Sequence, residues 1–166
     1  MSLERAFNSA LLADGRIVSI GVYGGRIAEI SATPLRAGSE IDVGGQLLVP
    51  GFVEGHIHLD TSFYGDAWQP HRPNTNGFDV RERVAFQAEN LKRAAPMAER
   101  ARKQLELCIG HGATAMRSHI MISAEVGLRH LEAVLPVREA FRGHIDLQLV
   151  AFPQSGILAS PGTAEL

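Results

Sequence analysis

Residues 50–60 read Pro50-Gly51-Phe52-Val53-Glu54-Gly55-His56-Ile57-His58-Leu59-Asp60. The Pro-Gly pair marks a turn, and the apolar run after it predicts a β-strand over residues 52–59. Side chains two positions apart on a strand point to the same side. His56 and His58 should therefore present two imidazoles on one face, where they can bind one divalent metal ion. An enzyme that activates water holds such an ion at the open end of a rigid element.

The composition is that of an ordinary globular protein. The chain has 166 residues, of which 45% are hydrophobic and 20% charged, and its net charge is −2. This length predicts one domain, or one domain and a small part. The charge offers no basic surface, so we expect no nucleic-acid partner and no membrane partner.

The chain carries no sequence signal for export or for a membrane. Its single cysteine, Cys108, excludes an internal disulfide framework and fits a reducing compartment. Residues 1–5 are not followed by the apolar core of a signal peptide, and no apolar run is long enough to span a bilayer. The sequence therefore predicts a cytoplasmic location.

The region before residue 50 predicts a small all-β unit. Its apolar segments are separated by turn signals at Asp14-Gly15, Gly24-Gly25 and Gly44-Gly45. We expect strands over residues 9–13, 17–23, 26–31, 41–43 and 46–49. The last two flank Gly44-Gly45 and are predicted to form a hairpin.

The region after residue 50 alternates strands with helices. Beyond the first strand and an irregular loop over residues 60–77, we expect helices over 79–92, 96–109 and 124–141 and strands over 113–122 and 145–152, with Asp79 as a helix N-cap and Pro136 as a kink. Such alternation indicates a parallel sheet with right-handed crossovers. A complete (β/α)₈ barrel takes about 250 residues, so we expect an incomplete barrel in a fragment or a truncated product. The predicted domains are residues 1–50 and 51–166.

Five segments carry a resemblance to a known family. They are Gly24–Ile30, Ile41–Gly45, Pro50–Asp60, Arg117-Ser118-His119 and Val150-Ala151-Phe152-Pro153-Gln154-Ser155-Gly156. Together they resemble the amidohydrolase superfamily, in its cytosine deaminase-like branch, which includes N-isopropylammelide amidohydrolase. The resemblance covers essentially the whole chain. It implies an α/β fold made of the first three β/α units of a TIM-type barrel, preceded by part of a small β-sandwich domain.

The resemblance also implies an activity. It is metal-dependent hydrolysis of a C–N bond in a nitrogen heterocycle of cytosine or aminotriazine type, so the expected partner is a small heterocyclic substrate. The cofactor would be one divalent metal ion, zinc or iron, which lowers the pKa of bound water toward neutrality. The activated water attacks a ring carbon, and a proton shuttle protonates the leaving amine.

Residue by residue, the resemblance makes His56 and His58 the first two metal ligands and Gln154 the amide that binds the heterocycle. The family's other ligands and its proton shuttle come from later strands, so no catalytic residue can be assigned in this chain. One departure is visible: the branch has a carboxylate where this chain has Met121. That difference alters the polar surroundings of the second barrel strand.

Several polar residues keep two interpretations. Arg117 and His119 share a strand face, so His119 either binds substrate or is a histidine bonded within the structure, and Arg117 either supports the site or is an ordinary strand residue. Asp60 either orients a metal-bound histidine or caps the following turn. Trp68 and His71 belong either to a lid over the substrate or to an ordinary loop anchor. No chemistry is assigned to His111, His130 and His144.

Two rival His-x-His families fail on local sequence. A metallo-β-lactamase-like hydrolase needs a further histidine where Thr61 stands, and a cupin needs a glutamate among residues 62–64, which are Ser, Phe and Tyr. A different class of function stays open: the chain could be a non-catalytic piece of barrel whose exposed sheet edge is covered in a homo-oligomer. Continuation of the reading frame beyond Leu166 would favour the enzyme.

Overall fold

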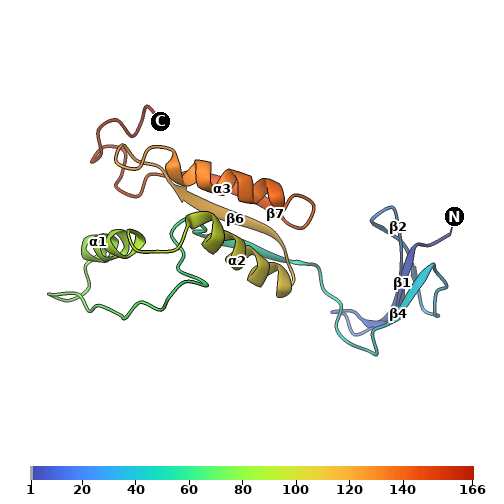
Figure 1. Ribbon diagram of the computed structural model, residues 1–166. Helices are drawn as coiled ribbons and strands as arrows, with labels where there is room; N and C mark the ends of the chain where they lie inside the picture. The colour runs from blue at the N-terminus through green and yellow to red at the C-terminus, as the bar shows by residue number, and fades with distance from the viewer. Residues whose placement is uncertain (1) are drawn as a thin grey trace. The chain divides into compact units, whose positions relative to one another are not determined.

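The computed structural model describes residues 2–166, which divide into one unit ending at Pro50 and a second running from Gly51 to Leu166 (Figure 1). Each unit has its own sheet. The first sheet has the strand order β3-β2-β1-β4 and the second the order β5-β6-β7. Within residues 2–166, no helix is both long and apolar enough to cross a bilayer.

The N-terminal sheet combines an antiparallel meander with one parallel strand. The meander consists of β1 (Arg5–Leu11), β2 (Ile17–Tyr23) and β3 (Arg26–Ser31), and β4 (Ser39–Asp42) pairs parallel to β1. Gly24 and Gly25 join β2 to β3 with φ of 57° and 71°, a conformation that glycine adopts without a steric penalty. Among the described residues up to Pro50 this is a single sheet, so the second layer expected of a β-sandwich is not present there.

The predicted hairpin around Gly44-Gly45 is wrong. Asp42 closes β4 beside Asn8 of β1, and Leu47 forms a parallel bridge with Leu11 of the same strand. Both flanks of the turn thus pair with β1 and not with each other. The β1 strand also begins at Arg5, earlier than predicted, and an irregularity near Ser9 (φ 59°) interrupts its pairing with β2.

The second unit confirms the predicted parallel β/α arrangement. Parallel strands β5 (Phe52–Ile57), β6 (Ala113–Met121) and β7 (Asp146–Phe152) are connected through helices α1 (Val80–Leu91), α2 (Met97–Gly110) and α3 (Arg129–Ala140). The helices α2 and α3 lie side by side against the sheet (Figure 1). The core between them and the sheet includes Leu59, Leu105, Ile120, Val134 and Leu147, all at most 3% exposed.

The β6 strand places the polar positions that matter for the site. Met116, Ser118 and Ile120 are buried, whereas Arg117 and His119, between them, are less buried. Because successive strand residues face opposite sides, His119 lies on the sheet face away from the core helices, near the C-terminal end of β6.

Three element boundaries differ from or refine the prediction. The β5 strand ends at Ile57, so His58 lies in the turn beyond the strand. The α3 helix starts at Arg129, because the preceding residues form a tight turn in which Ser123 and Gly127 pair. The N-cap role of Asp79 is confirmed, since its carboxylate accepts from the backbone N–H of Arg81 at 2.8 Å.

Candidate metal centre

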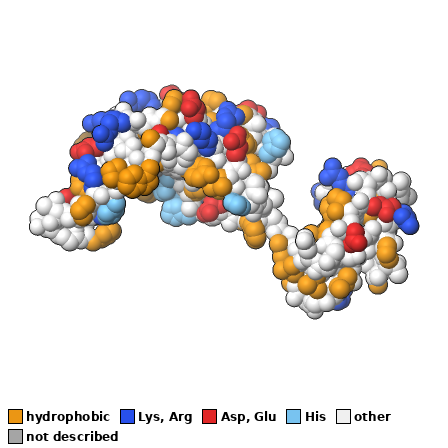
Figure 2. Space-filling model, turned by 60° about the horizontal axis from the view of Figure 1, so that its bottom comes forward, with side chains coloured by type: hydrophobic (Ala, Val, Ile, Leu, Met, Phe, Trp, Pro, Cys, Tyr) orange, Lys and Arg blue, Asp and Glu red, His pale blue; other side chains and the backbone are white. Residues whose placement is uncertain are grey.

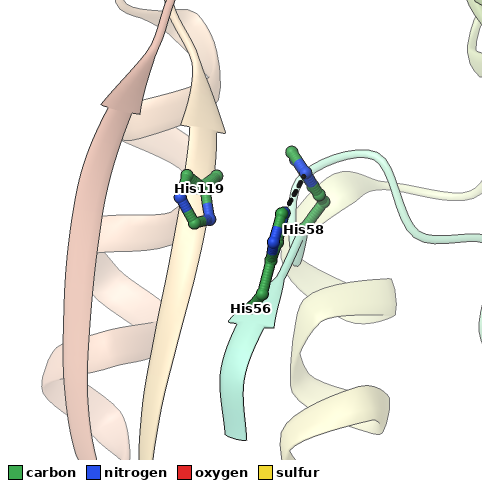
Figure 3. Close-up of side chains that lie close together, drawn as sticks. All are labelled: His56, His58 and His119. Carbon is green, nitrogen blue, oxygen red and sulfur yellow. Dashed lines mark hydrogen bonds between the residues drawn. The ribbon is translucent and has the colours of Figure 1, made fainter.

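Three histidines from the first two barrel strands converge at the C-terminal end of the sheet. His56 comes from β5, His58 from the turn that follows it, and His119 from β6 (Figure 3). One potential ligand atom from each ring lies within 4.8 Å of the other two. The spacing between His56 and His58 was visible in the sequence, and the pairing of β5 with β6 adds His119.

The arrangement fits a divalent transition metal. The Nε2 atoms of His56 and His58 are 3.4 Å apart. Two nitrogens bound tetrahedrally to zinc at about 2.0–2.1 Å would be about 3.3 Å apart. The Nδ1 atom of His119 is buried without a hydrogen-bond partner among the described residues. Neutral imidazole is a preferred ligand for zinc and iron, so these rings can hold the ion expected from the sequence.

The surroundings favour neutral imidazole at His58. Partial burial lowers the pKa of His58 most, and the adjacent rings of His119 and His56 lower it further, against the opposing charge of Asp60. Phe152 contributes to the apolar wall, since its ring stands edge-on to His58 at a centroid distance of 5.2 Å. A histidine must be unprotonated to bind a metal, so burial prepares this ring for that role.

The turn after His58 is tied to β6 by buried hydrogen bonds. The backbone N–H of Leu59 donates to Ser118 Oγ at 3.0 Å, and the Met121 N–H donates to Asp60 Oδ2 at 2.8 Å. The same Oδ2 atom lies 2.8 Å from Nδ1 of His130 on α3. Asp60 is fully buried, and the hydrogen bonds of its carboxylate go to β6 and α3 rather than to the turn that follows it.

Arg100 ties the same turn to α2. This arginine is only 2% exposed, and its guanidinium donates to the carbonyl oxygens of Ala95 (2.8 Å), Asp60 (3.3 Å) and Ser62. Burial lowers its pKa, opposed by the charges of Asp66 and Asp60. Burying an arginine costs free energy unless its N–H donors are hydrogen-bonded. Here these donors bind the irregular backbone directly after the histidine pair.

The remaining predicted site residues lie around this centre. Gln154 follows β7 and lines a cavity together with His58 and Gln87 of α1. Arg117 donates through Nε to Gln148 of β7 at 2.7 Å, so it braces neighbouring strands on the open face. Trp68 is 82% exposed in the loop between β5 and α1, where it and His71 line a separate hollow.

Sequence reasoning missed four residues of this region. His130 and Arg100 are ordinary helix residues in the sequence, and their partners around Asp60 lie 70 and 40 positions away. Ser118 and Phe152 fall inside segments that carried the family resemblance, so their place near the site could have been anticipated. No local signal marks His130 or Arg100.

In barrel enzymes built from parallel β/α units, the side chains of the active site lie at the C-terminal ends of the strands, as the three histidines do here. Comparison with protein families identifies the family. Residues 39–165 match the Amidohydrolase family, and the chain belongs to that family.

Within this family, the chain is similar to two N-isopropylammelide amidohydrolases. It is 32% identical over 160 residues to the N-isopropylammelide isopropyl amidohydrolase of Pseudomonas sp. (strain ADP), a match that covers 90% of this chain and 38% of the relative. The crystal structure of N-isopropylammelide isopropylaminohydrolase from Burkholderia multivorans superposes with a TM-score of 0.79 at 31% identity, covering 99% of this chain and 41% of that one.

A second solved structure is similar in fold and sequence. The 5-methylcytosine deaminase of Klebsiella pneumoniae, liganded with 5-fluorocytosine, superposes with a TM-score of 0.77 at 29% identity and covers 96% of this chain. The chain spans only 38–41% of the length of these three proteins, and the match lies in their N-terminal portion.

Proposed function

We propose that the protein is a metal-dependent amidohydrolase that cleaves a C–N bond of a nitrogen heterocycle of cytosine or aminotriazine type. The observation that carries the proposal is the convergence of His56, His58 and His119 at the C-terminal end of a parallel sheet in a chain of the amidohydrolase family. The ion would be zinc or iron, held first by His56 and His58. A cytoplasmic location, which suits the single Cys108, belongs to the same proposal.

His119 is assigned here to the metal rather than to the substrate. Its ring centroid lies 4.4 Å from that of His56, and its buried Nδ1 has no partner among the described residues. An unpartnered buried nitrogen costs free energy unless a ligand satisfies it. A bound ion would satisfy this nitrogen. The alternative expected from the sequence, a contact between His119 and the substrate, is tested with His119→Ala.

When bound, the ion would lower the pKa of a water molecule so that a nucleophile is available near neutral pH. The chain's own residues orient and shield this chemistry. The rings of His56, His58 and His119 would hold the ion at the strand ends, and the Phe152 ring, edge-on to His58, forms an apolar wall beside it. The proton that the leaving amine needs must come from a group outside the residues assigned here.

Gln154 is the proposed substrate contact. It lines the cavity that His58 also lines, and its amide offers both a donor and an acceptor. The edge of a cytosine or aminotriazine ring presents the complementary pair of groups. The names of the similar proteins, an N-isopropylammelide amidohydrolase and a 5-methylcytosine deaminase, support a substrate of this class.

A second candidate function is that of a non-catalytic piece of barrel, stable only in a homo-oligomer. The edge strands β5 and β7 each pair on one side only within residues 51–166, and large hydrophobic side chains are exposed on this unit, including Phe52 (62%) and Val53 (72%). Figure 2 shows hydrophobic side chains gathered at the surface of the unit. Exposed edges and apolar patches drive association. Residues 1–166 alone are therefore expected to self-associate and to lack turnover.

The test uses the full-length protein with His56→Ala and His58→Ala. We expect both variants to lose bound metal, measured by elemental analysis, together with release of ammonia or alkylamine from cytosine and aminotriazines. His144→Ala is the matched control, because this histidine is exposed in the loop after α3. Full metal occupancy and normal turnover in either site variant would refute the proposal. Size-exclusion chromatography and the same assays on residues 1–166 decide between the two candidates.

A further inference from the structure

The carboxylate of Asp60 is held from two sides in the interior of the second unit. It is 0% exposed, and its Oδ2 atom receives the backbone N–H of Met121 at the end of β6 and the Nδ1 of His130 on α3, each at 2.8 Å. Its Oδ1 atom is buried without a partner among residues 2–166. The orientation of this carboxylate therefore depends on a single oxygen and two donors.

Within residues 2–166, His130 is the only side chain that hydrogen-bonds this carboxylate, and a carboxylate oxygen accepts, so its Nδ1 carries the proton. The imidazole is 12% exposed, and it stands in the first turn of α3. A buried carboxylate is costly unless its oxygens are hydrogen-bonded, so the loss of a donor leaves it free to rotate or to draw water into the interior. The backbone N–H of Met121 alone cannot fix both the position and the plane of the group.

The position of Asp60 in the chain gives this bond a consequence at the candidate metal centre. Asp60 lies two residues after His58, and the backbone between them contains the Leu59 N–H that donates to Ser118. His58 stands beyond the end of β5, so no strand pairing of its own holds it. The hydrogen bonds of Leu59 and Asp60 orient the backbone that carries its ring, together with the Ser62 N–H, which donates to the His58 carbonyl at 3.1 Å, and the donors of Arg100.

We propose that His130 is a positioning residue for the metal centre: its hydrogen bond to Asp60 fixes the turn that presents His58 to the ion. The inference rests on the proposed metal-dependent function. His130 is not part of the histidine cluster and does not line the cavity that His58 shares with Gln154, although it and Gln154 line a neighbouring hollow. It acts through Asp60, so its removal weakens metal binding without removing a ligand. Residues that support metal ligands in this way change metal affinity or activity by roughly 10–100-fold.

The experiment compares two substitutions of His130 with one control in the full-length protein. His130→Ala removes the donor, whereas His130→Asn keeps a side-chain N–H close to the position of Nδ1. His144→Ala removes an exposed imidazole after α3 whose ring stands edge-on to Phe141 at a centroid distance of 6.5 Å. The zinc dissociation constant is measured by competition with a chromophoric chelator, and the cobalt(II) absorption spectrum reports ligand geometry.

We expect His130→Ala to weaken zinc binding about tenfold and to alter the cobalt spectrum. His130→Asn should bind zinc almost as tightly as the parent protein, and His144→Ala should match the parent in both measurements. The measurements are made well below the thermal midpoint of every variant. A merely structural role would lower the midpoint but leave zinc affinity and the cobalt spectrum of the folded protein intact. That result, with His130→Ala within twofold of the parent, would overturn the proposal.

Hydrogen–deuterium exchange of the segment 57–62 separates this inference from the proposed function. Parent protein that binds neither zinc nor ferrous iron refutes the metal-dependent function and, with it, a role of His130 in metal binding. Parent protein that binds zinc through His56 and His58, with unchanged exchange and affinity in His130→Ala, refutes the inference alone. Faster exchange in 57–62 together with weaker zinc binding supports both.

Discussion

Replacement of Arg100 by methionine tests how the turn after the histidine pair is held. Methionine keeps much of the aliphatic bulk of the arginine but removes every donor. Three backbone carbonyls, those of Ala95, Asp60 and Ser62, lose their partner. Because Arg100 is 2% exposed, water cannot readily replace the guanidinium without local opening of the structure.

The expected loss of stability follows from those bonds. A hydrogen bond from a charged donor contributes about 1.5–3 kcal/mol. The bond to Asp60, at 3.3 Å, is long and is counted as zero. The remaining two, taken at the lower figure, predict that Arg100→Met destabilises the protein by about 3 kcal/mol. Arg100→Lys keeps the charge but not the planar fork of donors, so its stability should lie between that of the parent protein and that of Arg100→Met.

Urea unfolding followed by circular dichroism measures this difference. The matched control is Arg138→Met, since Arg138 is exposed on α3, and it should change the free energy of unfolding by less than about 0.5 kcal/mol. A loss of less than about 1 kcal/mol in Arg100→Met would show that water replaces the guanidinium at low cost. The account of Arg100 as the link between α2 and the turn would then be wrong.

Three further outcomes are expected. His119→Ala should lower zinc affinity with a proportional loss of turnover. Unchanged zinc affinity with a raised KM would show instead that His119 contacts the substrate. Gln154→Ala should lower kcat/KM by a factor equivalent to about 1–3 kcal/mol while metal content is kept, and an unchanged kcat/KM for cytosine or an aminotriazine would contradict the contact. Burial raises the pKa of the Cys108 thiol, as does the charge of Glu54, so at pH 8 it should react with an aromatic disulfide reagent more slowly in the native protein than in urea; equal rates would contradict this.

Local sequence signals predicted most of the fold. The Gly24-Gly25 turn placed the β2–β3 hairpin, and the strand predicted over residues 113–122 corresponds to β6, because both depend on neighbouring residues. The hairpin at Gly44-Gly45 failed for the opposite reason. A turn signal shows that the chain reverses but not which strand the flanks will pair with, and here β1 is the partner on both sides.

The candidate site divides in the same way. The spacing of His56 and His58 indicated a metal pair, whereas the proximity of His119 comes from the pairing of β5 with β6 in the structure. The bonds to Asp60 from His130 and to its carbonyl from Arg100 join residues 70 and 40 positions apart. Their geometry depends on how α2 and α3 pack, which no pattern in one sequence specifies.

The histidine cluster also links two strands that are distant in the sequence. An ion bound by His56, His58 and His119 would act as a cross-link between β5 and β6, which closes the long loop containing α1 and α2. The three ligands come together only in the folded chain, so the free energy of metal binding becomes folding free energy. Above the dissociation constant, each tenfold rise in free metal would add about 1.4 kcal/mol to stability. The free concentration of metal would then set how resistant this unit is to unfolding.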